Sequence, residues 1–372
     1  MRTLDRRAIN RATLERQLLL RRSSLSVPDA VEHLVGLQAQ TPHTWYVGLW
    51  SRLAGFTPEQ ATEPLVDRSM VRMALMRSTI HLVTADDARA LRPLIQPVLD
   101  RDLYRNQTHG KPIADVDMAA LTADAADLLA PAALTNKQLG DLLSERWPGR
   151  PAASLVYAIR NQVPLVQVPP RALWGRSGSI AHTTADAWIG PDRTAPITLG
   201  RMIERYLGAF GPATIKDMQM WSGLTKLREV IDRMPGSLET FHDESGQVLF
   251  DVPDAPRPDG DTPAPPRFLY DFDNLLLSYA DRSRVITDAH GQWGYRTQRT
   301  IPQILLVDGF TAGDWRIERT RDAATLTVRP YRPPFEGEDA EQIAAEGQAL
   351  LEFTDPDAAT REVAFGAPHG QG

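Results

Sequence analysis

The chain contains no cysteine among its 372 residues. This absence excludes disulfide bonds, zinc sites built on thiolates, iron–sulfur clusters and a cysteine nucleophile. It is typical of a reducing compartment, and we expect a cytoplasmic protein. An apolar content of 42% and a charged content of 24% are those of an ordinary globular protein, and the length predicts about two to four domains.

Long hydrophobic runs are also missing. Residues 1–17 are rich in charge and lack the apolar stretch of a signal peptide. The longest uncharged run, residues 33–51, contains two glutamines, two histidines and a proline. These polar residues make the run a poor membrane span, so we expect no contact with a membrane.

The sequence motifs of several common enzyme classes are absent. There is no G-x-x-x-x-G-K-[ST], no G-x-G-x-x-G after a predicted strand, no G-x-S-x-G and no H-E-x-x-H. The eight histidines show no pair at the spacing of helical metal ligands, so we predict neither a metal site nor a cofactor. Lysine is rare, and no lysine lies in an apolar segment that would lower its pKa, which disfavours Schiff-base chemistry.

The net charge of −6 argues against a nucleic-acid partner, but the charge is unevenly distributed. Residues 336–362 hold nine acidic residues and one basic residue, whereas residues 1–22 hold seven arginines against two acidic residues. Arginine is also plentiful from 282 to 332. Local basic surface matters more to a phosphate backbone than net charge does. Composition alone leaves open whether these arginines bind phosphates or are ordinary solvated residues.

The first third of the chain predicts helices followed by strands. Ser26 is the expected N-cap of a helix that ends near Gly36, and a second helix is expected around 57–68. Residues 77–83 alternate like a strand. Helices followed by a strand pair are the order of a winged helix, and we assign the first such unit to residues 1–115.

The same order recurs twice. Residues 116–192 predict a helix capped by Thr135, a helix that begins with proline near 151, and two strands around a wing. Residues 193–252 predict a third unit, in which Gly223 supplies the turn of a helix-turn-helix. There is no fixed sequence period, so these are structural repeats only.

The remaining residues predict a linker and a second kind of module. Residues 253–267 contain six prolines and read as a linker. Residues 268–372 predict strands and hairpins and a last helix near 339–352, which is an α+β module. The expected fold class is therefore mainly α with small β-wings, α+β overall, with tandem winged-helix units and a C-terminal β-rich module.

Two glutamines, Gln38 and Gln40, interrupt an apolar segment directly before Thr41 and Pro42. Gly36 can end the preceding helix, and Pro42 disfavours helical geometry at Thr41, so the segment is predicted to be extended. Residues two apart on an extended chain project from one side. Two neutral amides so placed can hold a water molecule without carrying charge. From spacing alone, the simpler interpretation is that both amides bind backbone groups and hold a loop in place.

Several segments carry a resemblance to a known family: NRATLERQLLLRR, SVPDAVEHLVGLQAQTPHTWYVGLWSRL, LMRSTIHLVTADD, FDNLLLSYADRSRVI and VDGFTAGDWRIE. They resemble the AlkZ/YcaQ winged-helix DNA glycosylases over most of the chain. The resemblance implies that Gln38-Ala39-Gln40 is the catalytic motif, of the family's glutamine–apolar–glutamine form. It also implies tandem winged helices and a C-terminal β module in a C shape around a DNA channel.

The family removes bulky N7-alkylguanine lesions, and some members unhook interstrand crosslinks, often in bacteria that make the alkylating natural product. The resemblance therefore implies a monofunctional glycosylase in base excision repair, with double-stranded damaged DNA as partner and a nucleoid-associated location. We expect a monomer. The alternative is a winged-helix DNA-binding protein without catalysis, such as a transcriptional regulator.

A cationic purine is already a good leaving group, so the enzyme needs a positioned water more than a proton donor. DNA must also be held by cations. The expected phosphate contacts are Arg77, Arg176, Lys216, Arg282 and Arg284. Residues 288–297 are expected either as a hairpin whose Gly291 and Trp293 approach a DNA groove, or as a turn with Trp293 packed in the module.

Overall fold

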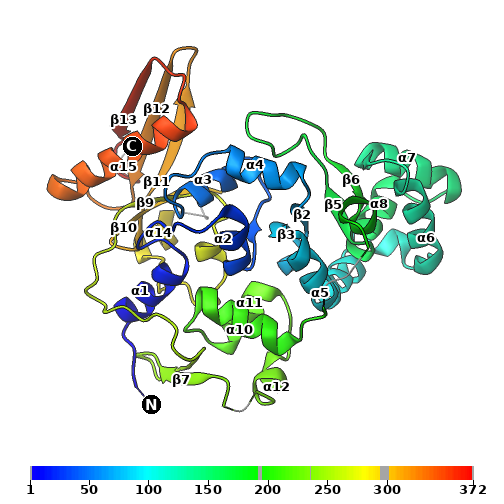
Figure 1. Ribbon diagram of the computed structural model, residues 1–372, viewed down its shortest axis with the longest axis horizontal. Helices are drawn as coiled ribbons and strands as arrows, with labels where there is room; N and C mark the ends of the chain where they lie inside the picture. Colours follow the sequence, from blue (N-terminus) through cyan, green and yellow to red (C-terminus); the bar gives the residue numbers. More distant parts are fainter. Residues whose placement is uncertain (1, 192–194, 235, 294–300, 371–372) are drawn as a thin grey trace.

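The computed structural model describes residues 2–191, 195–234, 236–293 and 301–370. Within these residues the fold is mixed α+β, with fifteen α-helices and sheets of six, five and two strands. Helices α6–α8 lie at one end of the molecule and the C-terminal sheet lies at the other (Figure 1). In the described part of the chain, no helix has the length and hydropathy that a bilayer-spanning segment requires.

The first repeat follows helix α1 and begins with a well-capped helix. Ser26 accepts a hydrogen bond from the backbone N–H of Asp29, as the sequence predicted, and Gly36 follows the helix with a φ of +89°. A Cβ on Gly36 would lie 2.7 Å from a methyl group of Val83, so only glycine fits there. The elements of this part are α1 (Arg6–Arg16), α2 (Val27–His33), β1 (Leu37–Gln38), α3 (Thr44–Trp50), α4 (Glu59–Val66), β2 (Met70–Ala74), the 3₁₀ turn η1 (Met76–Ser78) and β3 (Ile80–Thr84).

The second repeat has the same order and shares a sheet with the first. Thr135 caps its helix α7 through a capping box with Gln138, which confirms the predicted start. Strand β5 pairs with β2, so the sheet runs β1-β3-β2-β5-β6-β4 through both repeats. Helix α5 (Ala85–Arg105) and η2 (Lys111–Ile113) lead from the first repeat to the second, whose elements are α6 (Met118–Leu129), β4 (Leu134–Thr135), α7 (Asn136–Arg146), α8 (Ala152–Gln162), β5 (Leu165–Gln167) and β6 (Ala181–Thr184), followed by α9 (Ala185–Ile189).

The third repeat contains the predicted turn at Gly223, which ends α11 in the left-handed conformation with a φ of +79°. An isolated bridge between Ala213 and Phe250 takes the place that β1 and β4 have in the other repeats. The elements are α10 (Leu199–Phe210), α11 (Ile215–Ser222), α12 (Leu227–Ile231), β7 (Glu239–His242) and β8 (Val248–Asp251).

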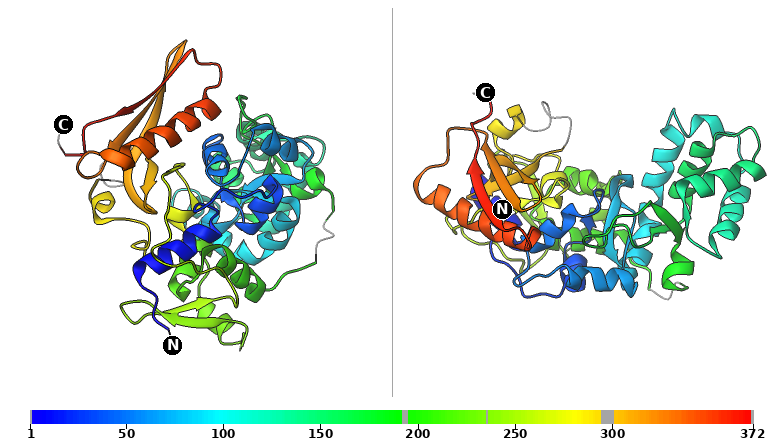
Figure 2. Two further views of the ribbon diagram at one scale, coloured as in Figure 1. Left: turned by 60° about the vertical axis from the view of Figure 1, so that its left-hand side comes forward. Right: turned by 90° about the horizontal axis from the view of Figure 1, so that it is seen from above.

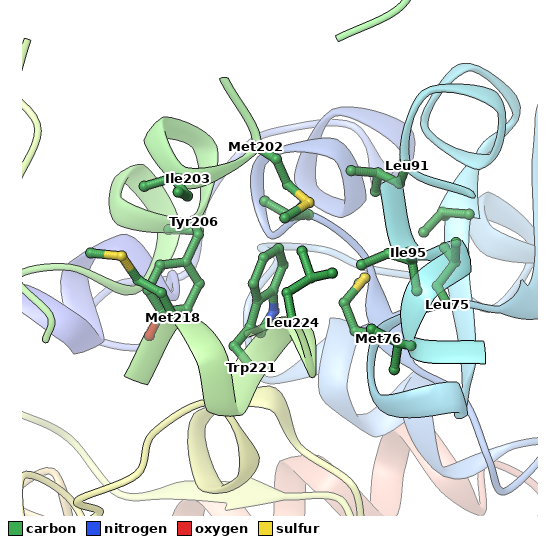
Figure 3. Packing of buried hydrophobic residues seen from close by; sticks show 14 of the residues in the cluster. Leu75, Met76, Leu91, Ile95, Met202, Ile203, Tyr206, Met218, Trp221 and Leu224 are labelled. Atoms are coloured by element: carbon green, nitrogen blue, oxygen red, sulfur yellow. The ribbon is translucent and has the colours of Figure 1, made fainter. Parts of the chain in front are cut away.

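A large apolar cluster fixes the third repeat against the first (Figure 3). Ile95 of α5, Met76 of the β2–β3 turn and Trp221 of α11 belong to this cluster, and Figure 3 shows Leu224 between Trp221 and the other two. Tyr206 of α10 lies with its ring centroid 4.9 Å from that of Trp221. Fully burying an apolar side chain of this size stabilises a fold by about 1.5–3 kcal/mol. The cluster therefore holds the β2–β3 turn rigidly beside α11.

The C-terminal module is a five-stranded sheet in the order β13-β12-β11-β10-β9. Strands β12 and β13 are parallel, and α15 crosses between them and packs against both (Figure 2). The predicted last helix is thus present. The elements are β9 (Arg267–Leu269), α13 (Asn274–Leu277), α14 (Asp288–Trp293), β10 (Gln303–Val307), β11 (Phe310–Arg319), β12 (Ala323–Pro330), α15 (Gly337–Thr354) and β13 (Thr360–Phe365).

The proline-rich residues 253–266 contain no helix or strand, yet they are held along α1. Arginine side chains of α1 donate to their backbone carbonyls: Arg16 to Pro256 at 3.1 Å, and Arg11 to Thr262 at 2.6 Å. These bonds give hydrogen-bond donors to carbonyls of a segment that forms no helix or sheet hydrogen bonds. The segment therefore follows a defined path along the N-terminal helix.

A buried ion pair connects the first repeat to the C-terminal module. Both Nη atoms of Arg52, at the end of α3, donate to the carboxylate of Asp273 at 2.8 and 2.7 Å, and both side chains are fully buried. Asp273 also caps α13 by accepting from the N–H of Leu275. The carboxylate of Asp273 raises the pKa of Arg52, against the opposing effect of burial.

We expect the Asp273→Ala substitution to lower the free energy of unfolding by about 3–5 kcal/mol, because it leaves the Arg52 guanidinium buried without its partner. Urea denaturation would measure the change. The control is Glu318→Ala, which breaks the exposed pair with Arg316 and should change stability by less than about 1 kcal/mol. Equal effects from the two substitutions would contradict this account of the buried pair.

Candidate active site

The predicted extended conformation is present at Gln38, the last residue of β1, whereas Gln40 lies at a bend in the chain. Gln38 pairs with His81 in the antiparallel β1–β3 ladder, and the N–H of Ala39 donates to the carbonyl of Ile80 at 2.7 Å. Gln38 and Ala39 are both buried, whereas Gln40 is exposed.

The carbonyl oxygens of both glutamines face the β2–β3 turn. Gln38 is 3% exposed, and its Oε1 accepts a hydrogen bond from Nη2 of Arg77 at 2.6 Å. Gln40 is exposed, and its Oε1 accepts from the backbone N–H of Ile80 at 3.2 Å. Each oxygen keeps a second lone pair. Among the residues that the structure describes, none accepts a hydrogen bond from either amide nitrogen.

Arg77 links this motif to the third repeat. It lies in η1 with a φ of +56°, and its Nη1 donates to the carbonyl of Trp221 at 2.5 Å. No carboxylate of the described chain pairs with it, and burial lowers its pKa to about 10. An arginine held by neutral acceptors keeps its full positive field at the site.

A second arginine lies behind the motif. Arg72 of β2 is 2% exposed, and its Nη2 donates to the carbonyl of Ala39 at 2.6 Å. Burial lowers its pKa to about 10, with the charge of Arg171 as a further cause, and within the described residues it too has no carboxylate partner. Two cations that lack a neutralising carboxylate therefore hold the Gln-Ala-Gln segment.

The C-terminal module holds the backbone of the motif from the other side. The hydroxyl of Tyr270 donates to the carbonyl of Gln38 at 2.9 Å. Asn274 accepts from the N–H of Gln38 at 3.2 Å and donates to the carbonyl of Gly36 at 2.6 Å. The strand is thus fixed along both edges. Sequence reasoning did not select Tyr270 or Asn274, although Asn274 lies in the quoted segment FDNLLLSYADRSRVI.

Asp271 fixes the residues that follow the motif. Its two carboxylate oxygens accept from the hydroxyls of Thr41 and Thr44, each at 2.6 Å. A carboxylate with both oxygens occupied in this way orients the loop between β1 and α3. Asp271 therefore acts here as a structural acceptor.

A cleft of about 810 Å³ opens beside Arg77, between α5 and α11. Arg77, Arg101, Arg105 and Lys216 contribute four cations to its lining, against the single carboxylate of Asp102. Arg105 and Lys216 are exposed, and no side-chain partner for either occurs in the described residues. Arg101 donates to the carbonyl of Gly223. Neither glutamine lines this cleft, so Arg77 is the residue that joins the two features.

The other predicted phosphate contacts lie apart from the cleft. Arg176 is exposed in the connection between β5 and β6, and Arg282 is partly exposed and near enough to Arg77 to lower the pKa of Arg77. Arg284 is buried, stacks on the ring of Tyr279 at 4.1 Å and donates to the carbonyl of Pro212 at 2.8 Å. It also pairs with Asp217, so its guanidinium is not available to a phosphate.

The hairpin considered for residues 288–297 is corrected by the structure in its described part. Residues 288–293 form helix α14, with Gly291 exposed on it. The side chain of Trp293 and residues 294–297 lie outside the described residues. The cleft arginines Arg101 and Arg105 were missed by sequence reasoning, although their i, i+4 spacing on α5 places them on one helix face.

A family model for AlkZ-like DNA glycosylases matches residues 31–353 of the chain. The chain belongs to this family. It is 25% identical over 326 residues to an interstrand DNA cross-link repair glycosylase of Streptomyces sahachiroi, a match that spans 82% of this chain and 85% of that protein. The solved structure of the Streptomyces sahachiroi DNA glycosylase AlkZ matches 98% of this chain and 100% of its own, with a TM-score of 0.76 and 21% identity. That structural likeness establishes an AlkZ-like fold.

In this AlkZ-like chain, the histidine that pairs with Gln38 is neutral. His81 is 1% exposed, and its Nδ1 lies 3.0 Å from the carbonyl of Thr79. Burial, and then the charge of Arg77, lowers the pKa of His81 to about 3. Burial also lowers the pKa of His182 in β6 to about 4. His81 therefore does not supply a proton near neutral pH.

We expect the folded state to lose stability as the pH falls below about 6.5. The unfolded chain then takes up protons on histidines that stay neutral in the folded chain, which removes about 1.4 kcal/mol per pH unit for each such histidine. Urea titrations from pH 7 to pH 5 would measure the decline, and His81→Gln should make it shallower. Equal slopes for the wild type and His81→Gln would show that burial of His81 does not govern this dependence.

Proposed function

We propose that the chain is a monofunctional DNA glycosylase that hydrolyses the N-glycosidic bond of cationic N7-alkylguanine, with Gln38 and Gln40 holding the attacking water. The observation that supports this most is that the Oε1 atoms of both neutral amides accept hydrogen bonds from residues 77–80, where Arg77 also lines a cationic cleft. Family membership gives the reaction class.

Neutral amides suit a substrate that already carries a positive charge. Alkylation at N7 makes guanine a good leaving group, so a general acid is not required. The remaining lone pairs on Oε1 of Gln38 and Gln40 can accept the protons of one water and present partial negative charge to an oxocarbenium-like sugar. Holding that water in place recovers part of a proximity advantage that reaches about 7–11 kcal/mol in ideal cases.

We propose that the cleft binds the DNA backbone through Arg105 and Lys216, whose charges are exposed and unneutralised. Arg176 and Arg282 extend the basic surface beyond the cleft. Each repeat has the order helix, short strand or bridge, helix, helix and hairpin, which supports an interpretation as three winged helices in a C shape around a DNA channel. All of these parts lie on one chain, so we propose that it acts as a monomer.

The lesion is proposed to be bulky. The similar Streptomyces protein is named as an interstrand cross-link repair glycosylase, and the present chain shares its fold over nearly its whole length. The cleft beside Arg77 is wide, and Val98, Met220 and Leu224 give its lining an apolar portion. Such a surface can receive the apolar part of an adduct beside the base.

We expect Gln38→Ala and Gln40→Ala each to slow excision of N7-methylguanine from duplex DNA by about 100-fold, because the attacking water loses its geometry. Single-turnover assays that detect abasic sites would measure the rates. Gln342→Ala is the matched control, since Gln342 is exposed on α15 and its side chain donates to Glu338. If both site variants fold normally and keep the wild-type rate, the catalytic assignment is wrong. A wild type that excises no N7 adduct but footprints a promoter would instead be a regulator.

We expect a strong preference for cationic bases. Uracil is uncharged and leaves poorly without a general acid, a contribution of about 10²–10⁴-fold in rate. Excision of uracil from the same duplex should therefore be at least about 100-fold slower than excision of N7-methylguanine. Comparable rates for the two bases would refute the neutral-amide mechanism while leaving glycosylase activity intact.

A further inference from the structure

We propose that Arg77 is a positioning residue that fixes the amide of Gln38, and that it acts through this glutamine rather than as a contact to a DNA phosphate. This inference rests on the proposed glycosylase function. It replaces the phosphate role that the sequence suggested for Arg77. It also names a residue outside the Gln-Ala-Gln motif on which excision should depend.

The contacts of Arg77 define the orientation of the glutamine. A guanidinium has donors and no acceptor, so only the carbonyl oxygen of Gln38 can face Nη2 of Arg77, at 2.6 Å. The amide nitrogen must then point away from Arg77. The bond also polarises the amide, because a charged donor on the oxygen strengthens the N–H groups as donors. Without Arg77, rotation of the amide by 180° would exchange its two ends.

Arg77 is poorly placed to bind a phosphate as well. Nη1 donates to Trp221 and Nη2 to Gln38, so two of its five N–H donors are used and the plane of the guanidinium is fixed by acceptors within the protein. Arg77 lines the cleft as a half-buried side chain, whereas the side chains of Arg105 and Lys216 are exposed there. Phosphate contacts are therefore better supplied by the exposed pair.

The backbone conformation and the burial at position 77 are both unfavourable for an arginine. Arg77 and Ser78 both adopt the left-handed conformation, with φ of +56° and +58°, which residues other than glycine rarely do. The guanidinium is desolvated without a carboxylate partner among the described residues. It also places a positive charge near a cationic base. Unfavourable features of this kind tend to occur where a site needs a fixed geometry.

The backbone suggests a substitution that separates folding from catalysis. Arg77→Gly removes the guanidinium but suits the left-handed backbone, so the melting temperature should stay near the wild-type value. We expect its single-turnover rate on N7-methylguanine, at saturating enzyme, to fall about 100-fold, which is the effect of a small misplacement of a reacting group. The dissociation constant for undamaged duplex should change by less than about twofold, since no phosphate contact is lost.

Arg68→Gly is a closely matched control. Arg68 is also left-handed, with a φ of +72°, and its Nη1 also donates to a tryptophan carbonyl, that of Trp188 at 3.0 Å. It is exposed and has no contact with either glutamine. This variant should excise at the wild-type rate. A loss like that of Arg77→Gly would overturn the inference, because it would trace the effect to the backbone.

A double-mutant cycle tests whether Arg77 acts through Gln38. Adding Arg77→Gly to Gln38→Ala should slow excision by less than about twofold, because the side chain that Arg77 orients is already gone. Millimolar methylguanidinium should restore part of the rate to Arg77→Gly and none to the double variant. Multiplicative losses, or a weaker dissociation constant with a shallower salt dependence, would identify Arg77 as a phosphate contact and overturn the inference.

The outcomes separate this inference from the proposed function. If the wild type excises, Gln38→Ala does not, and Arg77→Gly keeps the full rate, Arg77 has no positioning role and the glycosylase assignment stands. If the wild type excises no N7 adduct, both fail. Should Arg77→Gly melt well below the wild type, Arg77→Lys decides: a single ammonium cannot span both carbonyls, so a full rate would overturn the inference.

Discussion

The proposed site depends on the set of hydrogen bonds that hold Gln38 through its backbone and its side chain. The strand that carries Gln38 is only two residues long, and alone it would have no defined conformation. It is held by β3 on one edge, by Tyr270 and Asn274 of the C-terminal module on the other, and by Arg77 at its side chain. Its supports come from two parts of the sequence, residues 77–84 and residues 270–274, so the site requires the first repeat and the C-terminal module together.

The same dependence explains why the connections between the parts are buried and polar. Arg52 with Asp273 joins the first repeat to the C-terminal module, and Arg16 with Asp251 joins α1 to the third repeat, both fully buried. Buried ion pairs contribute little net stability compared with apolar packing, but they tolerate few alternative arrangements. In this chain they hold the relative placement of modules whose contacts must meet at one short strand.

The electrostatics around the motif balance two opposing demands. DNA needs a positive surface, whereas a cationic lesion and its transition state are repelled by one. The described contacts of Gln38 and Gln40 contain a guanidinium and backbone or amide groups but no carboxylate. In the proposed mechanism, neutral amide oxygens therefore face the sugar with partial negative charge while the arginines behind them stay fully charged. A carboxylate in their place would pair with Arg77 and weaken the field that attracts DNA.

Sequence patterns predicted the parts of this structure that depend on neighbouring residues. The cap of α2 at Ser26, the capping box at Thr135 and the left-handed turn at Gly223 each depend on a few adjacent side chains, and all three were predicted. The helix end at Gly36 and the extended conformation at Gln38 followed from neighbouring residues in the same way, whereas Gln40 lies at a bend. The prediction of a hairpin or a turn for residues 288–297 was wrong in its described part, because residues 288–293 form helix α14.

The remaining features could not be predicted from neighbouring residues, because they depend on contacts between segments that are far apart in the sequence. Strands β1 and β4 have two residues each, too few for any periodicity, and form the two edges of a sheet whose halves are joined by the pairing of β2 with β5. The burial of Arg284 and the exposure of Arg105 likewise depend on which helix packs over them, since both are arginines in polar stretches. The same holds for Arg77, whose role is set by Trp221 and Gln38, 144 and 39 residues away in sequence. The environment of a charged side chain depends on its acceptors, and for Arg77 one acceptor lies in its own repeat and the other in the third repeat.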